Sequence, residues 1–349
     1  MDHSKPRPEF YNLPFTIDRF NGMACRALGR SGLRVSDIGL GTWKFGYPET
    51  GDGSRVNEAD ALTILDRAVE VGVTFWDTAN RYNFSSGNSE RIIGKWLAAN
   101  ADQRRNVVIG TKIFGSMDGR TPNHCGLSRS NIIDSVHASL ARLQAEYVDL
   151  LYFHAFDPHT PPEESLVAVD DLVQQGLLRY FAVSNFTVDQ VRTYQQLEAK
   201  ISPRCRVLAV QNRFNILTGE AQAQAGMLDA APGRGISFVA YEPLARGLLT
   251  NRYLDPGRIG PGDRIHDEGS GEEMLTESNL AKVRALAEVA DASGAPVSRL
   301  VLAYMLALPS MGPVIPSASS VTQLEDNAAA AQLALSDEQK QRIRGIVGY

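Results

Sequence analysis

Polar residues suited to proton chemistry stand where several apolar runs of this chain end. Asp77, Lys112 and His154 each lie at or beside the end of such a run, and Tyr82 follows Asp77 by five positions. Because Lys and Asp are almost never fully buried unless they pair, we expect an ion pair between Asp77 and Lys112. Tyr82 would reach this pair from the following loop, and the ammonium would favour its phenolate, making the phenol a better acid.

Such a cluster would protonate an oxygen on which negative charge develops, while His154 holds or polarises a carbonyl oxygen. Since an acid alone cannot reduce a carbonyl, the hydride would come from a nicotinamide cofactor. Each residue also has a structural interpretation. Asp77 and Lys112 would then form a structural ion pair, and His154 would be an ordinary core histidine.

The elements that must position these residues are short apolar runs separated by amphipathic stretches. The runs are apolar throughout, which is typical of parallel strands buried on both faces. They span 36–43, 73–79, 107–113, 148–154, 179–185, 207–212, 237–244 and 312–317. Helical patterns between them include 57–72, 88–100, 128–144, 161–176 and 188–201. This alternation predicts the α/β class and a single (β/α)8 TIM barrel, with the strand ends meeting at one mouth.

Segments outside the repeat add to this barrel, which we expect to occupy residues 23–349. Residues 1–22 lack periodicity and predict a poorly packed N-terminal arm. Residues 25–35 predict a β-hairpin that plugs or covers the barrel. Residues 249–276, rich in Gly, Pro and charge, predict a long mobile loop over the active face. Residues 336–349 predict an extra C-terminal helix that begins after a Ser N-cap.

Composition excludes several classes of protein. The 349 residues are 43% hydrophobic and 21% charged, with a formal net charge of -5, which excludes disorder, collagen and coiled coil. The acidic balance gives no electrostatic reason to expect nucleic acid or a membrane as partner. Three scattered cysteines give neither a disulfide framework nor zinc spacing, and we expect no metal. No apolar run approaches about 18 residues, so a cytoplasmic protein is expected.

The segment GLGTWKFG at 39–46 has two interpretations. It opens like a Gly-rich phosphate loop, but Lys44 stands where a third glycine should be and no helix follows directly. The alternative is a tight exit from a strand, where glycine gives the backbone room. The second interpretation is favoured.

The motifs together resemble those of the aldo-keto reductases from about residue 24 to 335. WDTANRYNFSSGNSE at 76–90 is similar to the family's DTAxxYG signature, and IGTKI, VDLLYFHAFD, FAVSNF, AVQNRFN, YEPLARGLL and PVIPSASSVTQLEDN follow in the family's order. The resemblance implies that Tyr82 is the general acid. It also implies that Lys112 and Asp77 activate Tyr82 and that His154 orients the carbonyl of a small-molecule substrate.

The resemblance also implies a site for NADPH, with NADH as the alternative. Ser184, Asn185 and Gln211 would bond the nicotinamide carboxamide, and Tyr241 would stack on its ring. The pyrophosphate would follow the backbone of Leu244, Ala245 and Gly247. The adenosine half would contact the start of the last barrel helix. The remaining residues implied for the cofactor are Thr42, Trp43, Asp77, Glu242, Pro243, Ser317, Ser319, Gln323, Asp326 and Asn327.

Two departures from the family bear on the choice of cofactor. Glu242 stands where the family commonly has serine, and the IPSASS segment lacks the Lys or Arg that many members use for the 2′-phosphate of NADP. We nominate Arg252 and Arg264 as replacements, because guanidinium pairs with phosphate in a bidentate manner. The alternative is that both are solvated loop arginines.

Aromatic residues at or beyond strand ends predict an aromatic-lined mouth or, alternatively, packing at the barrel rim. They are Trp43, Phe45, Tyr47, Phe84, Phe114 and Phe156.

The leading hypothesis is NAD(P)H-dependent reduction of an aldehyde or ketone, with sugars and keto-glycosides among the candidates. The alternatives are a nucleotide-sensing auxiliary subunit, since potassium channel β subunits share the motifs, and an NAD(P)-dependent alcohol or sugar dehydrogenase. A monomer and a homo-oligomer are both compatible with the sequence.

Overall fold

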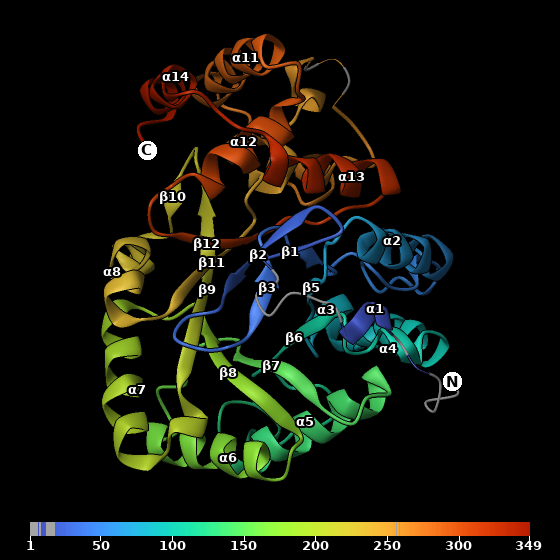
Figure 1. The fold of residues 1–349 in the computed structure, drawn as a ribbon, viewed down its shortest axis with the longest axis vertical. Coiled ribbons are helices and arrows are strands. Elements are labelled where there is room, and N and C mark those ends of the chain that lie inside the picture. The colour runs from blue at the N-terminus through green and yellow to red at the C-terminus, as the bar shows by residue number, and fades with distance from the viewer. Residues whose placement is uncertain (1–5, 7, 12–17, 256, 258) are drawn as a thin grey trace.

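Eight parallel strands form the centre of the computed structural model (Figure 1). The structure describes residues 6, 8–11, 18–255, 257 and 259–349. The barrel strands are β4 (Leu40–Gly41), β5 (Phe75–Asp77), β6 (Val108–Ile113), β7 (Val148–Phe153), β8 (Leu178–Ser184), β9 (Val207–Asn215), β11 (Ser237–Tyr241) and β12 (Met311–Ile315). Each lies within or overlaps one of the predicted runs.

The first and last parts of this sheet join, so the strands form a ring. Parallel bridges connect Ile38 with Val314 and Gly41 with Ser317, and the amide of Gly39 donates to the carbonyl oxygen of Val314 over 2.8 Å. A Cβ on Gly41 would lie 3.0 Å from Ser317 Oγ. This close approach leaves little room for a side chain at Gly41 and agrees with the interpretation of 39–46 as a tight exit from a strand.

Helices surround the barrel because their apolar faces pack on the outward side chains of the strands. The predicted pattern is confirmed for α2 (Glu58–Glu70), α4 (Asn88–Ala99), α5 (Arg129–Leu143), α6 (Pro162–Gln174) and α7 (Val188–Ile201). The other longer helices are α8 (Met227–Arg234), α11 (Glu277–Ala292), α12 (Val297–Leu306) and α13 (Val321–Ala329). None of the described helices is long and apolar enough to cross a membrane.

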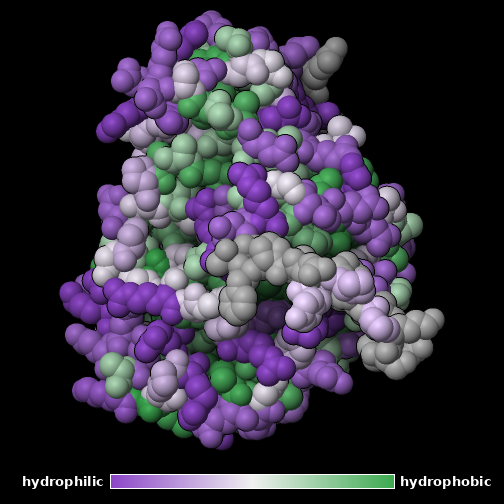
Figure 2. Space-filling view, viewed as in Figure 1, coloured by the Kyte–Doolittle hydropathy of each residue, from purple (hydrophilic) through white to green (hydrophobic). Residues whose placement is uncertain are grey.

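The predicted hairpin is present and plugs the amino end of the barrel. β2 (Met23–Ala27) pairs antiparallel with β3 (Arg34–Ser36), and it crosses the barrel in the view of Figure 1. Leu28 and Val35, both buried, pack with the apolar side chains that fill the barrel interior. Figure 2 shows the same face, on which polar residues cover most of the surface.

Part of the predicted arm has regular structure. β1 (Arg19–Phe20) pairs with β2, and a short helix, α1, spans Pro8–Tyr11. The remainder of the predicted arm, residues 1–5, 7 and 12–17, lies outside the described residues.

Two other insertions have more structure than a loop. The segment predicted as a mobile loop over the active face lies at the cavity described below, and it contains short helices, among them α9 (Arg264–Asp267) and α10 (Gly271–Met274). The side chain of Ile265 in α9 is fully buried and packs this segment against the core. β9 also continues into a small hairpin with β10 (Gly219–Glu220).

The predicted C-terminal helix is confirmed as α14 (Asp337–Val347), whose N-cap Ser336 forms a capping box with Gln339.

Candidate active site

A cavity of about 810 Å³ opens at the carboxyl ends of the barrel strands. The four residues expected to do proton chemistry all line it: Asp77, Tyr82, Lys112 and His154. They come from β5, the short helix α3 (Tyr82–Ser85) that follows it, β6 and the residue after β7. The residues expected at the cofactor that also line the cavity are Trp43, Ser184, Asn185, Gln211, Tyr241, Glu242, Pro243, Leu244, Gly247, Arg252, Arg264, Ser317, Ser319, Gln323, Asp326 and Asn327.

The predicted ion pair between Lys112 and Asp77 is present and buried. Lys112 Nζ lies 2.6 Å from Asp77 Oδ2, and their side chains are 1% and 4% exposed. Lys112 also donates to the carbonyl oxygen of Thr78 over 2.8 Å, and Gln211 Nε2 donates to Asp77 Oδ1 over 2.8 Å. These bonds offset part of the desolvation cost and hold the ammonium in one place.

Tyr82 completes the pair, but the direction of its pKa corrects our expectation. Its hydroxyl oxygen accepts a hydrogen bond from Lys112 Nζ over 2.9 Å and lies 3.4 Å from Asp77 Oδ2. We expected the ammonium to lower the pKa of the phenol. Burial, followed by the Asp77 carboxylate, instead raises the pKa of Tyr82 well above its usual value. The phenol therefore keeps its proton at neutral pH.

His154 is a neutral side chain beside this phenol. The rings of Tyr82 and His154 meet edge to face with centroids 6.2 Å apart. Burial, with smaller contributions from Lys112 and Arg81, lowers the pKa of His154 to about 3. Its Nδ1 is buried without a hydrogen-bond partner among the described residues. The imidazole is thus uncharged over the physiological range and is suited to a hydrogen bond rather than an ion pair.

A chain of amide and hydroxyl groups borders the four residues. Asn185 Nδ2 donates to the carbonyl oxygen of His154 over 2.9 Å, and the hydroxyl of Tyr241 donates to Asn185 Oδ1 over 2.8 Å. Ser184 Oγ donates to the carbonyl oxygen of Gln211 over 2.8 Å. These bonds fix the side chains that the resemblance assigns to the nicotinamide carboxamide.

Backbone conformations that non-glycine residues seldom adopt cluster around the cavity. Asn83, Phe84 and Ser85, directly after Tyr82, have φ of 61°, 52° and 65°. Glu242 and Arg246, in the loop after β11, have φ of 56° and 57°. Such left-handed conformations are strained for L-residues and concentrate at functional sites.

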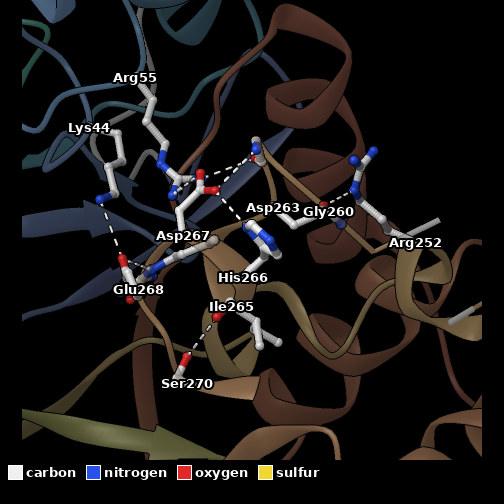
Figure 3. Close-up of polar contacts among 12 residues, drawn as sticks. Lys44, Arg55, Arg252, Gly260, Asp263, Ile265, His266, Asp267, Glu268 and Ser270 are labelled. Atoms are coloured by element: carbon white, nitrogen blue, oxygen red, sulfur yellow. Dashed lines mark hydrogen bonds and ion pairs between the residues drawn. The ribbon is translucent and has the colours of Figure 1, made fainter. Parts of the chain in front are cut away.

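A charged segment, residues 262–268, lies at one side of the cavity, which Gly262, Asp263 and Arg264 line, and we call it the strap. Figure 3 shows its polar contacts. Glu268 pairs with Lys44 at 3.4 Å, and Asp267 pairs with Arg55 at 2.9 Å. Arg55 also donates to the carbonyl oxygen of Gly262 over 3.1 Å. The strap thereby connects the loop after β11 to the loop after β4, across the cavity that both line.

The two nominated arginines lie at the cavity and both are paired. Arg264 binds Glu242 at 2.8 Å and stacks over the ring of Trp43, with its guanidinium carbon 4.6 Å from the centroid. Arg252 pairs with Asp263. Glu242, the departure from the family pattern, is therefore neutralised by a cation of the strap.

Sequence reasoning missed other charged residues at the cavity. Lys44, Arg55 and Arg246 line it. Arg299, which the prediction did not name, does not line the cavity but binds Asp326 Oδ1, which does, at 2.5 Å. Lys44 and Arg55 have partners in the strap, more than 200 positions along the chain, so local spacing carried no signal for them.

Some predicted residues lie elsewhere. Thr42 is buried and donates to the carbonyl oxygen of Asp77 over 2.9 Å, and Ala245 is also buried; neither lines the cavity. Of the expected aromatic mouth, Trp43 lines the cavity. Phe45 is fully buried in the core and Phe156 packs against Phe186, so these two positions follow the alternative of rim packing. The others that do not line the cavity are Tyr47, Phe84 and Phe114.

Comparison with known proteins agrees with this arrangement. The profile of the aldo/keto reductase family matches residues 37–347, which contain the whole barrel and all four residues of the cluster. The chain belongs to this family. The barrel described above is therefore that of an aldo/keto reductase.

Relatives of this aldo/keto reductase have more than one role. It is 33% identical to an L-glyceraldehyde 3-phosphate reductase of Escherichia coli, over 90% of this chain and 89% of the relative. It is 30% identical to a versiconal hemiacetal acetate reductase of Aspergillus parasiticus, over 90% and 94%. It is 28% identical to a probable voltage-gated potassium channel subunit beta of Oryza sativa, over 93% and 97%. Membership of this family, together with the reductases among the relatives, identifies the chain as an oxidoreductase.

Proposed function

We propose that this protein reduces an aldehyde or ketone to the alcohol with a reduced nicotinamide cofactor, and that Tyr82 is the general acid. One observation carries the proposal. The hydroxyl of Tyr82 faces a cavity in hydrogen-bond contact with a buried ammonium, beside a neutral imidazole. A protonated phenol, an ammonium and a neutral hydrogen-bond donor together stabilise an oxygen that becomes an alkoxide.

Each residue has a separate task in this proposal. His154 donates a hydrogen bond to the carbonyl oxygen and holds it near Tyr82. Tyr82 gives its proton to that oxygen, which leaves a phenolate. The Lys112 ammonium, 2.9 Å from the same phenol oxygen, stabilises the phenolate, and Asp77 keeps the ammonium in place.

The cavity fits a dinucleotide in size and in lining. Its volume of about 810 Å³ lies in the range of cofactor sites, and its lining continues from Tyr241 past Leu244 to Ser317 and Asn327. When bound, reduced nicotinamide supplies the hydride. Asn185 and Gln211 would hold its carboxamide, Tyr241 would cover one face of the ring, and the first residues of α13 would receive the adenosine half. We take NADPH as the preferred form.

The substrate class rests on the relatives. Reductases of a phosphorylated sugar aldehyde and of a hemiacetal acetate are among them, and these names support a carbonyl on an oxygenated small molecule. Sugars and keto-glycosides are therefore the first compounds to test. We also propose that the enzyme acts in the cytoplasm.

Two measurements on the purified protein test the function. Fluorescence titration with NADPH and with NADH should show saturable binding of at least one. Aldehydes, ketones and sugars should then cause oxidation of the bound reduced form, followed by absorbance. Failure of both cofactors to bind ends the proposal. So does binding with no carbonyl-dependent oxidation across the panel.

Selectivity for NADPH has its own test in the two nominated arginines. Arg264→Ala and Arg252→Ala should each weaken NADPH more than NADH, because only NADPH carries the 2′-phosphate that a guanidinium would bind. Arg246→Ala is a matched control, since Arg246 also lines the cavity and lies 3.6 Å from Glu242. Equal loss for both cofactors would show that neither arginine reads the 2′-phosphate.

A second candidate function comes from the channel-subunit relatives, which match nearly the whole chain. Such a protein would act as a nucleotide sensor. Single-turnover kinetics distinguish the two. Rapid oxidation by carbonyls with free exchange of cofactor supports the enzyme, whereas cofactor that is oxidised once and never released supports the sensor. Net oxidation of alcohols or sugars at cellular cofactor ratios would favour the dehydrogenase direction.

A further inference from the structure

A second tyrosine lies beneath the ammonium of Lys112. Tyr152 on β7 is the register partner of Lys112 on β6, and neighbouring partners in a parallel sheet point to the same side. Lys112 Nζ is 5.8 Å from the centroid of the Tyr152 ring and 5.0 Å from that of Tyr82. Both distances are within the reach of a cation–π interaction. The ammonium therefore has two aromatic rings as neighbours.

The neighbouring strand is shaped to admit this ring. A Cβ added to Gly110, two residues before Lys112 on the inward side of β6, would lie 3.0 Å from Tyr152 Cε2. A larger residue at position 110 would force the ring to shift. Gly110 and the Tyr152 ring thus lie against each other inside the barrel, and Lys112 Nζ lies over the face of that ring.

The charge on Lys112 needs support because the side chain is buried. Burial lowers the pKa of Lys112, while Asp77 raises it. The other ionisable groups around it are Tyr82, His154, Tyr152 and Glu90, which is buried on α4 and paired with Arg142 at 2.7 Å. Of these, His154 is uncharged at neutral pH and the phenols are protonated. Besides the Asp77 carboxylate, the more distant Glu90 carboxylate and the oxygens that accept its hydrogen bonds, the ammonium has the faces of two aromatic rings as favourable neighbours.

The hydroxyl of Tyr152 does not explain why this residue is here. It is buried and makes no hydrogen bond of good geometry among the described residues, although the Gln211 side chain lies close enough to lower the pKa of the phenol against the larger effect of burial. A buried hydroxyl without a partner costs stability relative to the same ring without it. The useful part of Tyr152 is therefore its ring, and phenylalanine should serve as well.

We propose that Tyr152 is a positioning residue for the reaction. Its ring face, seated over Gly110, keeps the Lys112 ammonium charged and directed at the Tyr82 hydroxyl. The importance of this for turnover rests on the proposed function, because it assumes that Tyr82 is the acid. The effect on the charge of Lys112 does not depend on any activity.

The direct test follows the protonation of Lys112 by NMR of lysine labelled with ¹³C at Cε, with Lys112→Met to assign the signal. In Tyr152→Leu, the pKa of Lys112 should fall by about one unit, a tenfold weaker hold on the proton. Tyr152→Phe should restore the value of the original protein. Replacement by pentafluorophenylalanine keeps a ring but removes its negative face, and should behave like leucine. An unchanged pKa in both the leucine and the fluorinated variants overturns the proposal.

Kinetics give an independent readout. The alkaline limb of kcat/KM against pH should move to lower pH in Tyr152→Leu and return in Tyr152→Phe, while the dissociation constant of the cofactor stays within about twofold. Gly110→Ala should shift the limb in the same direction, because it displaces the ring. A loss of activity that is equal at all pH values would mean a packing role and overturn the proposal. If the original protein reduces no carbonyl, the proposed function fails, and the NMR titration still decides the role of Tyr152.

Discussion

The two ends of the barrel differ in the polarity of the side chains that fill them. At the amino end the hairpin inserts Leu28 and Val35 among apolar side chains. Gly29 passes so close to β9 that a Cβ would lie 2.3 Å from the carbonyl oxygen of Leu208, and its φ of +53° also favours glycine. At the carboxyl end a charged, hydrogen-bonded cavity remains open. One end is filled for stability, and the other holds groups whose burial has a cost.

That cost can be located. The buried Lys112 and Asp77 lose their hydration, and His154 Nδ1 is left without a partner among the described residues. A buried unsatisfied group costs on the order of 1–3 kcal/mol. In the proposed function these groups carry out the chemistry, and the apolar end contributes the stability that they do not. Variants at the two ends should therefore separate activity from stability.

The largest expected effect is on turnover at the open end. Tyr82→Phe removes the proposed acid while keeping the ring, and turnover should fall by roughly 10²–10⁴. Cofactor affinity should change little, because the ring still fills its place. Steady-state kinetics and a fluorescence titration measure the two quantities. Unchanged turnover with a good carbonyl substrate would remove Tyr82 from the mechanism.

Acid should destabilise the protein through His154. Its pKa is about 3 in the fold, below the value near 6.5 expected when unfolded, so the unfolded state binds the extra proton. Stability from the neutral imidazole is complete above about pH 6.5 and is lost as pH falls towards 3, by about 1.4 kcal/mol per pH unit. Urea unfolding of the original protein and of His154→Gln over this range isolates the contribution. Equal pH dependence in both would contradict the assignment.

At the plugged end the effect should be on stability alone. Leu28 is fully buried, and Leu28→Ala should lower the free energy of unfolding by about 2–5 kcal/mol through lost contacts and a cavity. Turnover by the folded fraction should be unchanged, since the hairpin lies at the opposite end from the cavity. Denaturant unfolding beside kinetics at low temperature checks this. A drop in kcat for fully folded protein would show that the two ends are coupled.

The smallest effect is expected where the strap crosses the mouth. The Arg55–Asp267 pair is partly exposed, so Arg55→Ala should change cofactor binding by less than about 1 kcal/mol, or fivefold. High salt should reduce the difference. Asp267→Asn removes the same pair. The double variant should therefore lose no more cofactor affinity than the single variant with the larger loss. Additive losses would mean that the two residues act separately.

The barrel itself could be predicted because its signals are local. Continuous apolar runs mark buried parallel strands, and a polar residue such as Lys112 at the end of a run lies at the mouth. The same logic gave the plug, whose strands surround a glycine turn. It left two alternatives for Phe45 and Phe156, mouth or rim packing, because position near a strand end does not tell on which side of the barrel wall a ring lies; the structure shows packing for both.

The rest of the site depends on contacts between distant segments. Lys44 and Arg55 become part of the cavity through Glu268 and Asp267, and no spacing rule links these residues. The pKa of Tyr82 was misjudged for a related reason. The ammonium beside it was foreseen, but the depth of burial, which dominates, is a property of the folded chain.

The three successive left-handed residues after Tyr82 bear on attempts to make the protein more heat-tolerant. Replacing Asn83, Phe84 or Ser85 by glycine would relieve backbone strain of about 1 kcal/mol at each position. These positions are therefore obvious choices for substitutions that raise stability. They also connect Tyr82, the proposed acid, to α4. Selection for thermal resistance at this turn would therefore act on catalysis at the same time, and gains in one property should be weighed against losses in the other.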